Sequence, residues 1–171
     1  MNPDQDIVID RVDENDEVMW PISRKNIFRE QANFRTSHIF VFNPGGELLL
    51  QQLASTRERY PGRWGSSVAG YVLAGETYQQ AAERKLQDEL GIDKESLGLE
   101  LVGKTEMADE GRKKFITLYK AVYKGKIKPN TEQMDDAKYF ALKEIAEMRR
   151  KNEDQFTPTF LFLLDYNNQK K

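Results

Sequence analysis

The chain has 171 residues, no cysteine and a formal net charge of −2, and 32% of its residues are charged. This length fits one domain, residues 1–171, that buries about 70% of the surface exposed by its unfolded form. The near balance of charge provides no overall field for a nucleic-acid polymer or a membrane surface, so we expect neither as a partner.

Two further features of the composition narrow the class of protein. Without cysteine the chain has no disulfides, no thiolate metal site and no cysteine nucleophile. The longest apolar run is shorter than the about 20 residues that span a bilayer. The acidic start MNPDQDIVID lacks the basic-then-apolar order of a signal peptide. We therefore expect a cytoplasmic protein.

The first half of the chain contains two pairs of apolar segments around polar turns. Strands on either side of the acidic turn at 13–16 predict a β-hairpin, which we assign to an N-terminal extension over residues 1–34. The sequence NPGG separates 37–42 from 47–53, and its proline and glycines favour a tight turn. These two segments therefore predict a second hairpin.

A polar loop at 55–66 and a short apolar strand at 67–72 precede the central helix. We expect this helix to begin near Thr77 and to end at Gly91, because glycine commonly terminates helices. Apolar or small residues recur every four positions along it, at Tyr78, Ala82, Leu86 and Leu90.

The second half predicts three more strands and two helices. The strands are expected at 97–107, 115–125 and 136–141, and one helix at 142–150. The last helix begins after Thr157, which can cap it, with Pro158 in its first turn. Strands before and after a central helix predict an α/β (α+β) fold, in which helices cover a mixed sheet.

The central helix carries a group of charged residues that matters for function. Lys85, Asp88 and Glu89 share one helix face, because successive residues rotate by about 100 degrees. Carboxylates on this face, with backbone carbonyls of the loop that starts at Gly70, provide the oxygen ligands that Mg²⁺ prefers. The alternative is a solvated helix face with ion pairs four residues apart, such as Arg84 with Asp88.

The segment 70–92 resembles the Nudix box. That motif runs glycine, five residues, glutamate, seven residues, Arg-Glu, an aliphatic residue, any residue, two glutamates, any residue, glycine and an aliphatic residue. Lys85 departs from it, because it stands where the box has glutamate. Eight positions match in register, one of them with aspartate for glutamate: Gly70, Glu76, Arg84, Leu86, Asp88, Glu89, Gly91 and Ile92.

The resemblance implies a Nudix-type α/β/α sandwich and an activity. Nudix enzymes hydrolyse diphosphates linked to another group, often a nucleoside, with Mg²⁺ or Mn²⁺. By position, Glu89 is the principal metal ligand, Asp88 a second ligand or a group that orients water, and the Gly70 carbonyl region completes the site. Arg84 and Glu76 form an internal ion pair that holds the loop to the helix.

Upstream residues resemble the branch of the family related to type I isopentenyl diphosphate isomerases. Where those enzymes have a catalytic cysteine, a glycine and a metal-binding histidine, this chain has Ala69, Gly70 and Tyr71. Ala69 cannot transfer a proton, so we exclude isomerase activity. Lys85 matches a basic residue that such isomerases tend to carry, which favours an isomerase-like Nudix hydrolase.

Several residues outside the box are candidates for substrate binding or for a third metal ligand. Arginines beside aromatic rings suit a base and its phosphates, although solvated arginines and a packed tryptophan are the alternative. His38, the only histidine, is expected to be a hydrogen-bonded structural residue. The substrate-binding candidates are Arg35, Arg57, Arg63, Trp64 and Lys85, with Arg59 and Tyr60 beside them. The candidates for a further carboxylate ligand are Glu106, Asp109 and Glu110.

These features favour a Mg²⁺- or Mn²⁺-dependent hydrolase of a diphosphate linkage in nucleoside di- or triphosphates or related compounds. The alternative is a catalytically weak Nudix fold that binds a nucleotide or a protein, because an ammonium at Lys85 repels a nearby cation. We expect a small-molecule diphosphate as the partner, and a homodimer is possible.

Overall fold

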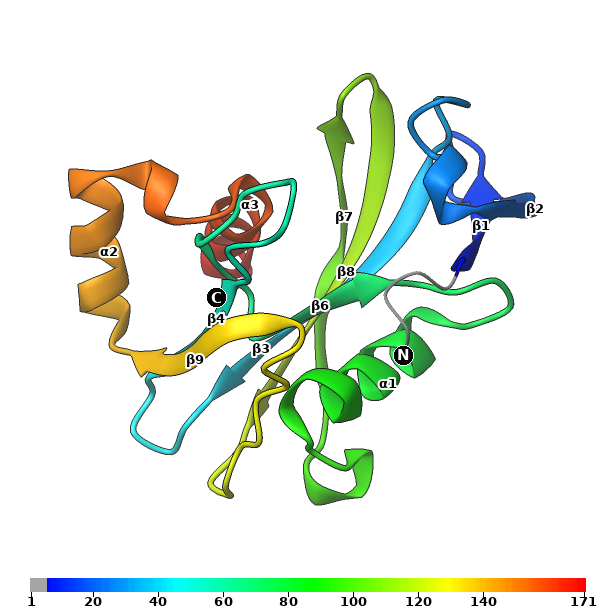
Figure 1. Ribbon diagram of the computed structural model, residues 1–171. Coiled ribbons are helices and arrows are strands. Elements are labelled where there is room, and N and C mark those ends of the chain that lie inside the picture. Colours follow the sequence, from blue (N-terminus) through cyan, green and yellow to red (C-terminus); the bar gives the residue numbers. More distant parts are fainter. Residues whose placement is uncertain (1–5) are drawn as a thin grey trace.

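A mixed β-sheet lies between helices in the computed structural model, which describes residues 6–171 (Figure 1). The described chain also contains short 3-10 helices at Arg24–Asn26, Lys94–Ser96 and Glu153–Gln155. The strands are β1 (Val8–Val12), β2 (Val18–Ser23), β3 (Phe34–Phe42), β4 (Leu48–Leu53), β5 (Trp64–Gly65), β6 (Val68–Tyr71), β7 (Glu100–Asp109), β8 (Arg112–Val122) and β9 (Met134–Phe140). The helices are α1 (Tyr78–Leu90), α2 (Leu142–Lys151) and α3 (Pro158–Gln169).

The larger sheet follows the order β5-β4-β3-β8-β7, with β6 also paired to β3 and β9 to β4. β3 and β8 are parallel, and the other pairs are antiparallel. The expected hairpin of β3 and β4 forms only at its closed end, where Phe42 pairs with Leu48. Beyond that point β6 pairs with β3 from Thr36 to Ile39, while β9 pairs along β4. The two strands therefore diverge because each finds a partner far away in the sequence.

Side chains that alternate along β3 bury two separate cores. Ile39 and Val41 pack in the cluster that contains Leu86 and Leu90 of α1. Phe40 packs on the other face, in the cluster that contains residues of α2 and α3 such as Phe160. Because successive strand residues face opposite sides, one sheet has helices on both faces. The α/β/α sandwich with a mixed sheet is confirmed.

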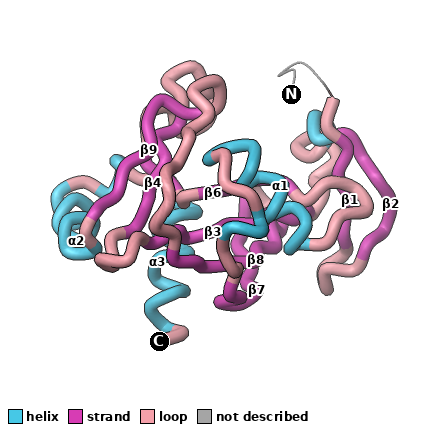
Figure 2. Tube along the Cα trace, turned by 90° about the horizontal axis from the view of Figure 1, so that it is seen from below, coloured by secondary structure: helices cyan, strands magenta, loops and turns pink. Residues whose placement is uncertain are grey.

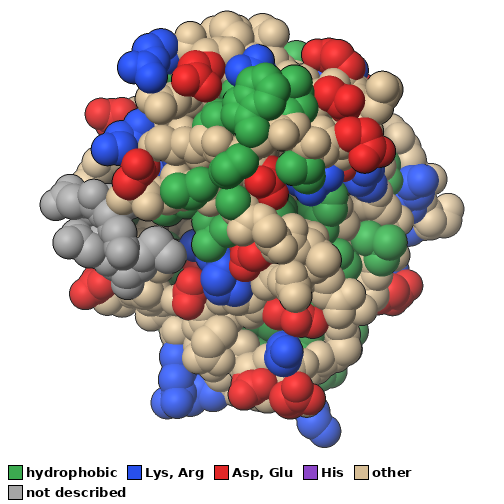
Figure 3. Space-filling view, turned by 90° about the vertical axis from the view of Figure 1, so that its right-hand side faces the viewer, with side chains coloured by type: hydrophobic (Ala, Val, Ile, Leu, Met, Phe, Trp, Pro, Cys, Tyr) green, Lys and Arg blue, Asp and Glu red, His purple; other side chains and the backbone are tan. Residues whose placement is uncertain are grey.

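The expected N-terminal hairpin is also confirmed, as the separate two-stranded sheet of β1 and β2. It lies at one end of the molecule, with α2 at the opposite end (Figures 1 and 2). Residues 1–5 of the expected extension over 1–34 lie outside the described residues. The face on this side of the molecule has hydrophobic side chains between charged ones (Figure 3). Large exposed hydrophobic residues of the hairpin and the turn after it are Val8, Val18, Met19, Trp20 and Phe28.

The residues expected to begin and end α1, and to begin α3, occupy those positions. The Thr77 side chain accepts a hydrogen bond from the backbone N–H of Gln80, and the Gln80 side-chain oxygen accepts one from the backbone N–H of Thr77. Gly91 ends α1 with φ 65°, a left-handed conformation that suits glycine. Thr157 caps α3 ahead of Pro158. In the described part of the chain, no helix is both long and apolar enough to span a membrane.

Candidate functional site

A cavity of about 390 Å³ contains two residues of the box, Gly70 and Glu89. Its walls come from β3, β4, β6, β7, β8, the end of α1, the start of α3 and the loop between β4 and β5. Three basic side chains also line it: Arg57, Arg59 and Lys114. Side chains from distant parts of the chain thus meet where α1 ends against the sheet.

Glu89 is a buried carboxylate in the last turn of α1, with 4% of its surface exposed. Its Oε1 accepts a 2.9 Å hydrogen bond from the Ala69 backbone N–H, and its Oε2 accepts one of 3.2 Å from Gln51. Burial raises the pKa of Glu89, and the charge of Lys85 opposes that effect. Among residues 6–171 no basic group lies within 4.0 Å of this carboxylate. A bound cation would therefore supply the charge partner that Glu89 lacks.

Lys85 covers the glycine at the start of the box. A Cβ built on Gly70 would lie 2.6 Å from Cγ and Cδ of Lys85, so the lysine alkyl chain packs directly on this backbone. The Lys85 ammonium donates a 3.3 Å hydrogen bond to Oε1 of Gln133. Lys85 is outside the lining of the cavity. Position 85 therefore contributes neither the carboxylate of the usual box nor an ammonium to the cavity.

Asp88 and Glu89 point in different directions, although both belong to the box. The Asp88 side chain is 38% exposed, lies 3.8 Å from Arg84 and is outside the cavity lining. Adjacent helical residues differ by about 100 degrees, so the cavity receives only one of them. The geometry supports Glu89 as a metal ligand more directly than Asp88.

The structure brings Glu76 and Arg84 together. Arg84 donates hydrogen bonds of 2.8 and 3.0 Å to the two oxygens of Glu76, and another of 3.0 Å to the Tyr71 backbone carbonyl. Burial alone would raise the pKa of Glu76. The hydrogen bonds from Arg84 and from the Leu73 backbone N–H have a larger opposite effect, so the pKa is lowered. This pair ties the loop before α1 to the helix.

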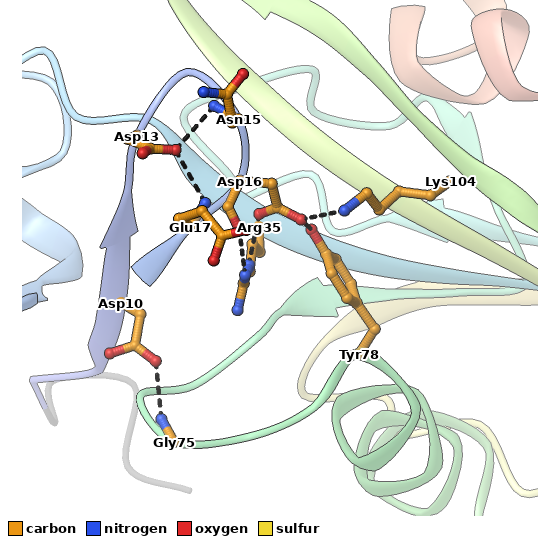
Figure 4. A network of polar contacts seen from close by, with 9 residues as sticks. All are labelled: Asp10, Asp13, Asn15, Asp16, Glu17, Arg35, Gly75, Tyr78 and Lys104. Atoms are coloured by element: carbon orange, nitrogen blue, oxygen red, sulfur yellow. Dashed lines mark hydrogen bonds and ion pairs between the residues drawn. The ribbon is translucent and has the colours of Figure 1, made fainter. Parts of the chain in front are cut away.

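The substrate-binding candidates occupy different places. Arg57 lines the cavity, whereas Arg35, Arg63 and Trp64 do not. The guanidinium of Arg35 is bound to Asp16 at 2.6 Å (Figure 4). Trp64 packs edge-on against Phe140 at 4.9 Å between ring centres, as the packing alternative expected.

Arg63 is directed to the C-terminal part of the chain. It donates a 3.3 Å hydrogen bond to the Phe156 carbonyl and lies 3.8 Å from Asp154. This arginine therefore connects the loop before β5 to the segment that leads into α3.

The three candidates for a further carboxylate do not supply a free ligand. Asp109 lines the cavity, but it lies 3.0 Å from Arg59 and 3.5 Å from Arg112. Glu106 lies 3.6 Å from Lys113. Glu110 also lines the cavity, but its side chain is 62% exposed and lies 4.0 Å from Arg59 and 3.9 Å from Arg112. Within residues 6–171 no group of three or more His, Cys, Asp or Glu side chains is arranged to hold a metal ion.

The oxygen donors around the cavity fit a divalent cation that the protein ligates only in part. Mg²⁺ in proteins commonly has one or two carboxylates, several waters and phosphate oxygens of the substrate as ligands. Glu89 with the Gly70 carbonyl region fits that partial ligation. A cage made only of protein side chains does not fit.

Lys114, Gln51 and Ser66 line the cavity but were missed by sequence reasoning. For Lys114 a signal existed, because it alternates with the buried Ile116 and Leu118 on one face of β8. Lysine rarely occupies an inward-facing position of a strand, because it is usually exposed to solvent. Gln51 and Ser66 had no comparable signal, since short polar residues are common in strands and loops.

His38 has the structural surroundings that were expected for it, and it also lines the cavity. Its Nδ1 lies 2.9 Å from the Ser66 hydroxyl, and burial lowers the pKa of His38 to about 3. The imidazole is therefore neutral at physiological pH.

Comparison with known proteins agrees with the fold and the box. The model of the NUDIX domain matches residues 33–160. The chain belongs to the Nudix hydrolase family. An uncharacterized Nudix hydrolase of Listeria monocytogenes is 34% identical over 123 residues, which are 72% of this chain and 71% of that protein.

Two other similar proteins bear on the branch of the family and on the fold. The isopentenyl-diphosphate Delta-isomerase of Serratia proteamaculans is 27% identical over 158 residues, 90% of this chain and 87% of that enzyme. The crystal structure of DR0079 from Deinococcus radiodurans has a TM-score of 0.75 and 21% identity, and covers 85% of this chain and 90% of its own. The relationship to the isomerase branch is confirmed.

Proposed function

We propose that this Nudix hydrolase cleaves a diphosphate linkage in a nucleoside di- or triphosphate, or in a related compound with another group on the diphosphate, with Mg²⁺ or Mn²⁺. The observation that carries the proposal is the buried Glu89 carboxylate, which faces a cavity and has no basic partner within 4.0 Å among the described residues. A charge in such a place is costly unless a cation accompanies it.

The chain's own residues divide the work in this proposal. Glu89 and the Gly70 carbonyl region hold the cation, which when bound neutralises phosphate charge and lowers the pKa of water. Hydrogen bonds from Ala69 and Gln51 fix the Glu89 carboxylate in position. Arg57 and Arg59 provide positive charge for the remaining phosphate oxygens.

One observation favours the alternative of a binding module without turnover. Lys85 covers Gly70, and Asp88 is outside the cavity, so the helix of the box provides one inward carboxylate where the usual pattern has three acidic residues on that helix. Hydrolysis remains the preferred proposal because one well-held metal can serve this chemistry.

Substrate profiling combined with Glu89→Gln tests the proposal. We expect hydrolysis products of the diphosphate linkage from at least one of a panel of nucleoside di- and triphosphates, nucleotide sugars and dinucleotides with Mg²⁺ or Mn²⁺. Glu89→Gln should lower kcat/KM by on the order of 100-fold or more, because the ligand charge is lost. Glu83→Gln, on the same helix but outside the cavity, is the matched control and should have little effect.

Two results would contradict hydrolysis. One is the absence of product across the whole panel together with a ligand-dependent rise in Tm, which would favour the binding module. The other is an active enzyme that Glu89→Gln leaves unchanged, which would place the reaction away from this carboxylate.

A further inference from the structure

Lys114 is a basic residue placed on the inner side of the fold. It lies on β8, on the face that packs toward α3, and its ammonium donates a 2.7 Å hydrogen bond to the Thr159 hydroxyl at the start of α3. Lys114 also lines the cavity that contains Glu89. One of its three N–H donors is therefore used by Thr159, which leaves two for other partners.

No acidic side chain pairs with Lys114 in the described part of the chain within 4.0 Å. The carboxylate of Asp109 is near enough to influence it, but that carboxylate is held by Arg59 at 3.0 Å and Arg112 at 3.5 Å. Burial lowers the pKa of Lys114 to about 8. Lys114 is partly buried, and an ammonium that is partly removed from water and lacks a counter-charge is unfavourable, so its environment suits an anion that comes from outside.

The surroundings of Lys114 agree with an anionic ligand. Arg57 is exposed at the same cavity and has no acidic partner within 4.0 Å among residues 6–171. The volume of about 390 Å³ is within the usual range for small-ligand sites. Glu89 accepts hydrogen bonds from Ala69 and Gln51, whereas Lys114 donates one to Thr159. The carboxylate and the ammonium are therefore held by different residues.

We infer that Lys114 binds a phosphate group of the substrate directly, so that this cavity holds a diphosphate even without a divalent cation. The inference rests on the proposed function for its substrate class. An ammonium is a compact point charge that forms charge-assisted hydrogen bonds with phosphate oxygens. Lys114 is thus a substrate-binding residue contributed by β8, outside the box.

The test is calorimetric titration of the full chain with inorganic pyrophosphate in excess EDTA. Wild type should bind, and Lys114→Met should weaken Kd by about tenfold or more, because a charge-assisted hydrogen bond contributes about 1.5–3 kcal/mol. Lys114→Arg keeps the charge and should recover most of the affinity. Lys113→Met is the matched control, because Lys113 is the adjacent residue and pairs with Glu14 at 3.1 Å outside the cavity. Its Kd should stay within about twofold of wild type.

The outcomes separate this inference from the proposed function. Pyrophosphate binding that requires Mg²⁺, or that Lys114→Met leaves unchanged, would overturn the role of Lys114 even if the enzyme hydrolyses nucleotides. Lys114-dependent binding in EDTA would support it even if the substrate panel gives no product. Circular dichroism checks folding, and Lys114→Gln replaces Lys114→Met as the deciding variant if the methionine variant does not fold.

Discussion

Position 85 bears on how many carboxylates surround the proposed cation site. The alkyl chain of Lys85 packs on Gly70, and its ammonium is held by Gln133, so this side chain has a structural place of its own. Glu89, one helical turn later, is left as the only carboxylate of the box that lines the cavity in the described structure. The affinity for a free divalent cation should therefore be low until phosphate oxygens complete its ligands.

Lys85→Glu tests this view of the residue. A glutamate four positions before Glu89 lies on the same helix face, and two carboxylates there repel each other without a metal. In EDTA we expect Tm to fall by roughly 2–4 °C, corresponding to about 1 kcal/mol. Added Mg²⁺ should then raise Tm more than it does for wild type, measured by differential scanning fluorimetry.

The control for this prediction is Lys85→Met, which keeps most of the chain that covers Gly70 but removes the charge. It should create no new Mg²⁺ response. Equal Mg²⁺ responses in Lys85→Glu and wild type would show that position 85 does not reach the cation site.

At the scale of elements, an ion pair connects the loop between β6 and α1 to the helix. Arg84 on the helix bonds both oxygens of Glu76 and the carbonyl of Tyr71, while the Leu73 N–H also donates to Glu76 at 2.8 Å. These contacts fix where β6 ends relative to α1. They thereby keep Gly70 beside the helix that carries Glu89.

Glu76→Gln should destabilise the protein by about 1.5–3 kcal/mol, because hydrogen bonds to a charged group are lost. The pH dependence has a definite sign. The pKa of Glu76 in the folded protein is below its ordinary value of 4.5, so its contribution is full above pH 4.5 and disappears as pH falls through the folded pKa. Urea unfolding at pH 7 and at pH 3 measures both effects.

The difference in unfolding free energy between wild type and Glu76→Gln should therefore shrink at pH 3. Glu83→Gln, whose partner Lys94 lies 3.8 Å away, serves as the comparison and should cost less than about 1 kcal/mol. A difference that stays constant with pH would rule out the ionised pair as the source of stability.

At the scale of the whole molecule, Asp16 connects the N-terminal hairpin to the rest of the fold (Figure 4). It lies in the turn between β1 and β2 with φ 65°, and only 2% of its side chain is exposed. Arg35 of β3 donates to it at 2.6 Å, Tyr78 of α1 at 2.8 Å and Lys104 of β7 at 2.5 Å. One carboxylate therefore joins the hairpin, the sheet and α1.

Asp16→Ala should lower the unfolding free energy by about 3 kcal/mol, because it leaves the partly buried Arg35 without its charge partner. The corresponding fall in Tm is roughly 6–12 °C for a chain of this size. Glu17→Ala, at an exposed neighbouring position in the same turn, should change Tm by less than about 2 °C. Similar Tm values for the two variants would mean that the Asp16 carboxylate contributes little to holding the hairpin.

Much of the architecture could be predicted because it depends on neighbours along the chain. The period of two in β3 and of about four in α1 sets which residues face a core, and Thr77 and Gly91 bound the helix through local hydrogen bonds and backbone geometry. The register of the box from Gly70 to Ile92 likewise needs only spacing. These features, the family and the sandwich were therefore accessible from the sequence by itself.

Only the tertiary structure decided which charged groups meet. Arg35 pairs with Asp16, 19 positions earlier, and Lys114 reaches Thr159, 45 positions later. The divergence of β3 from β4 depends in the same way on the remote strands β6 and β9. Such choices follow from competition among distant partners for the same charge or strand edge, which local periodicity does not encode. The sequence thus determined the box and the layers. The folded chain determined that, among the described residues, Glu89 is the only carboxylate of the box in the cavity and that a partly buried lysine joins it there.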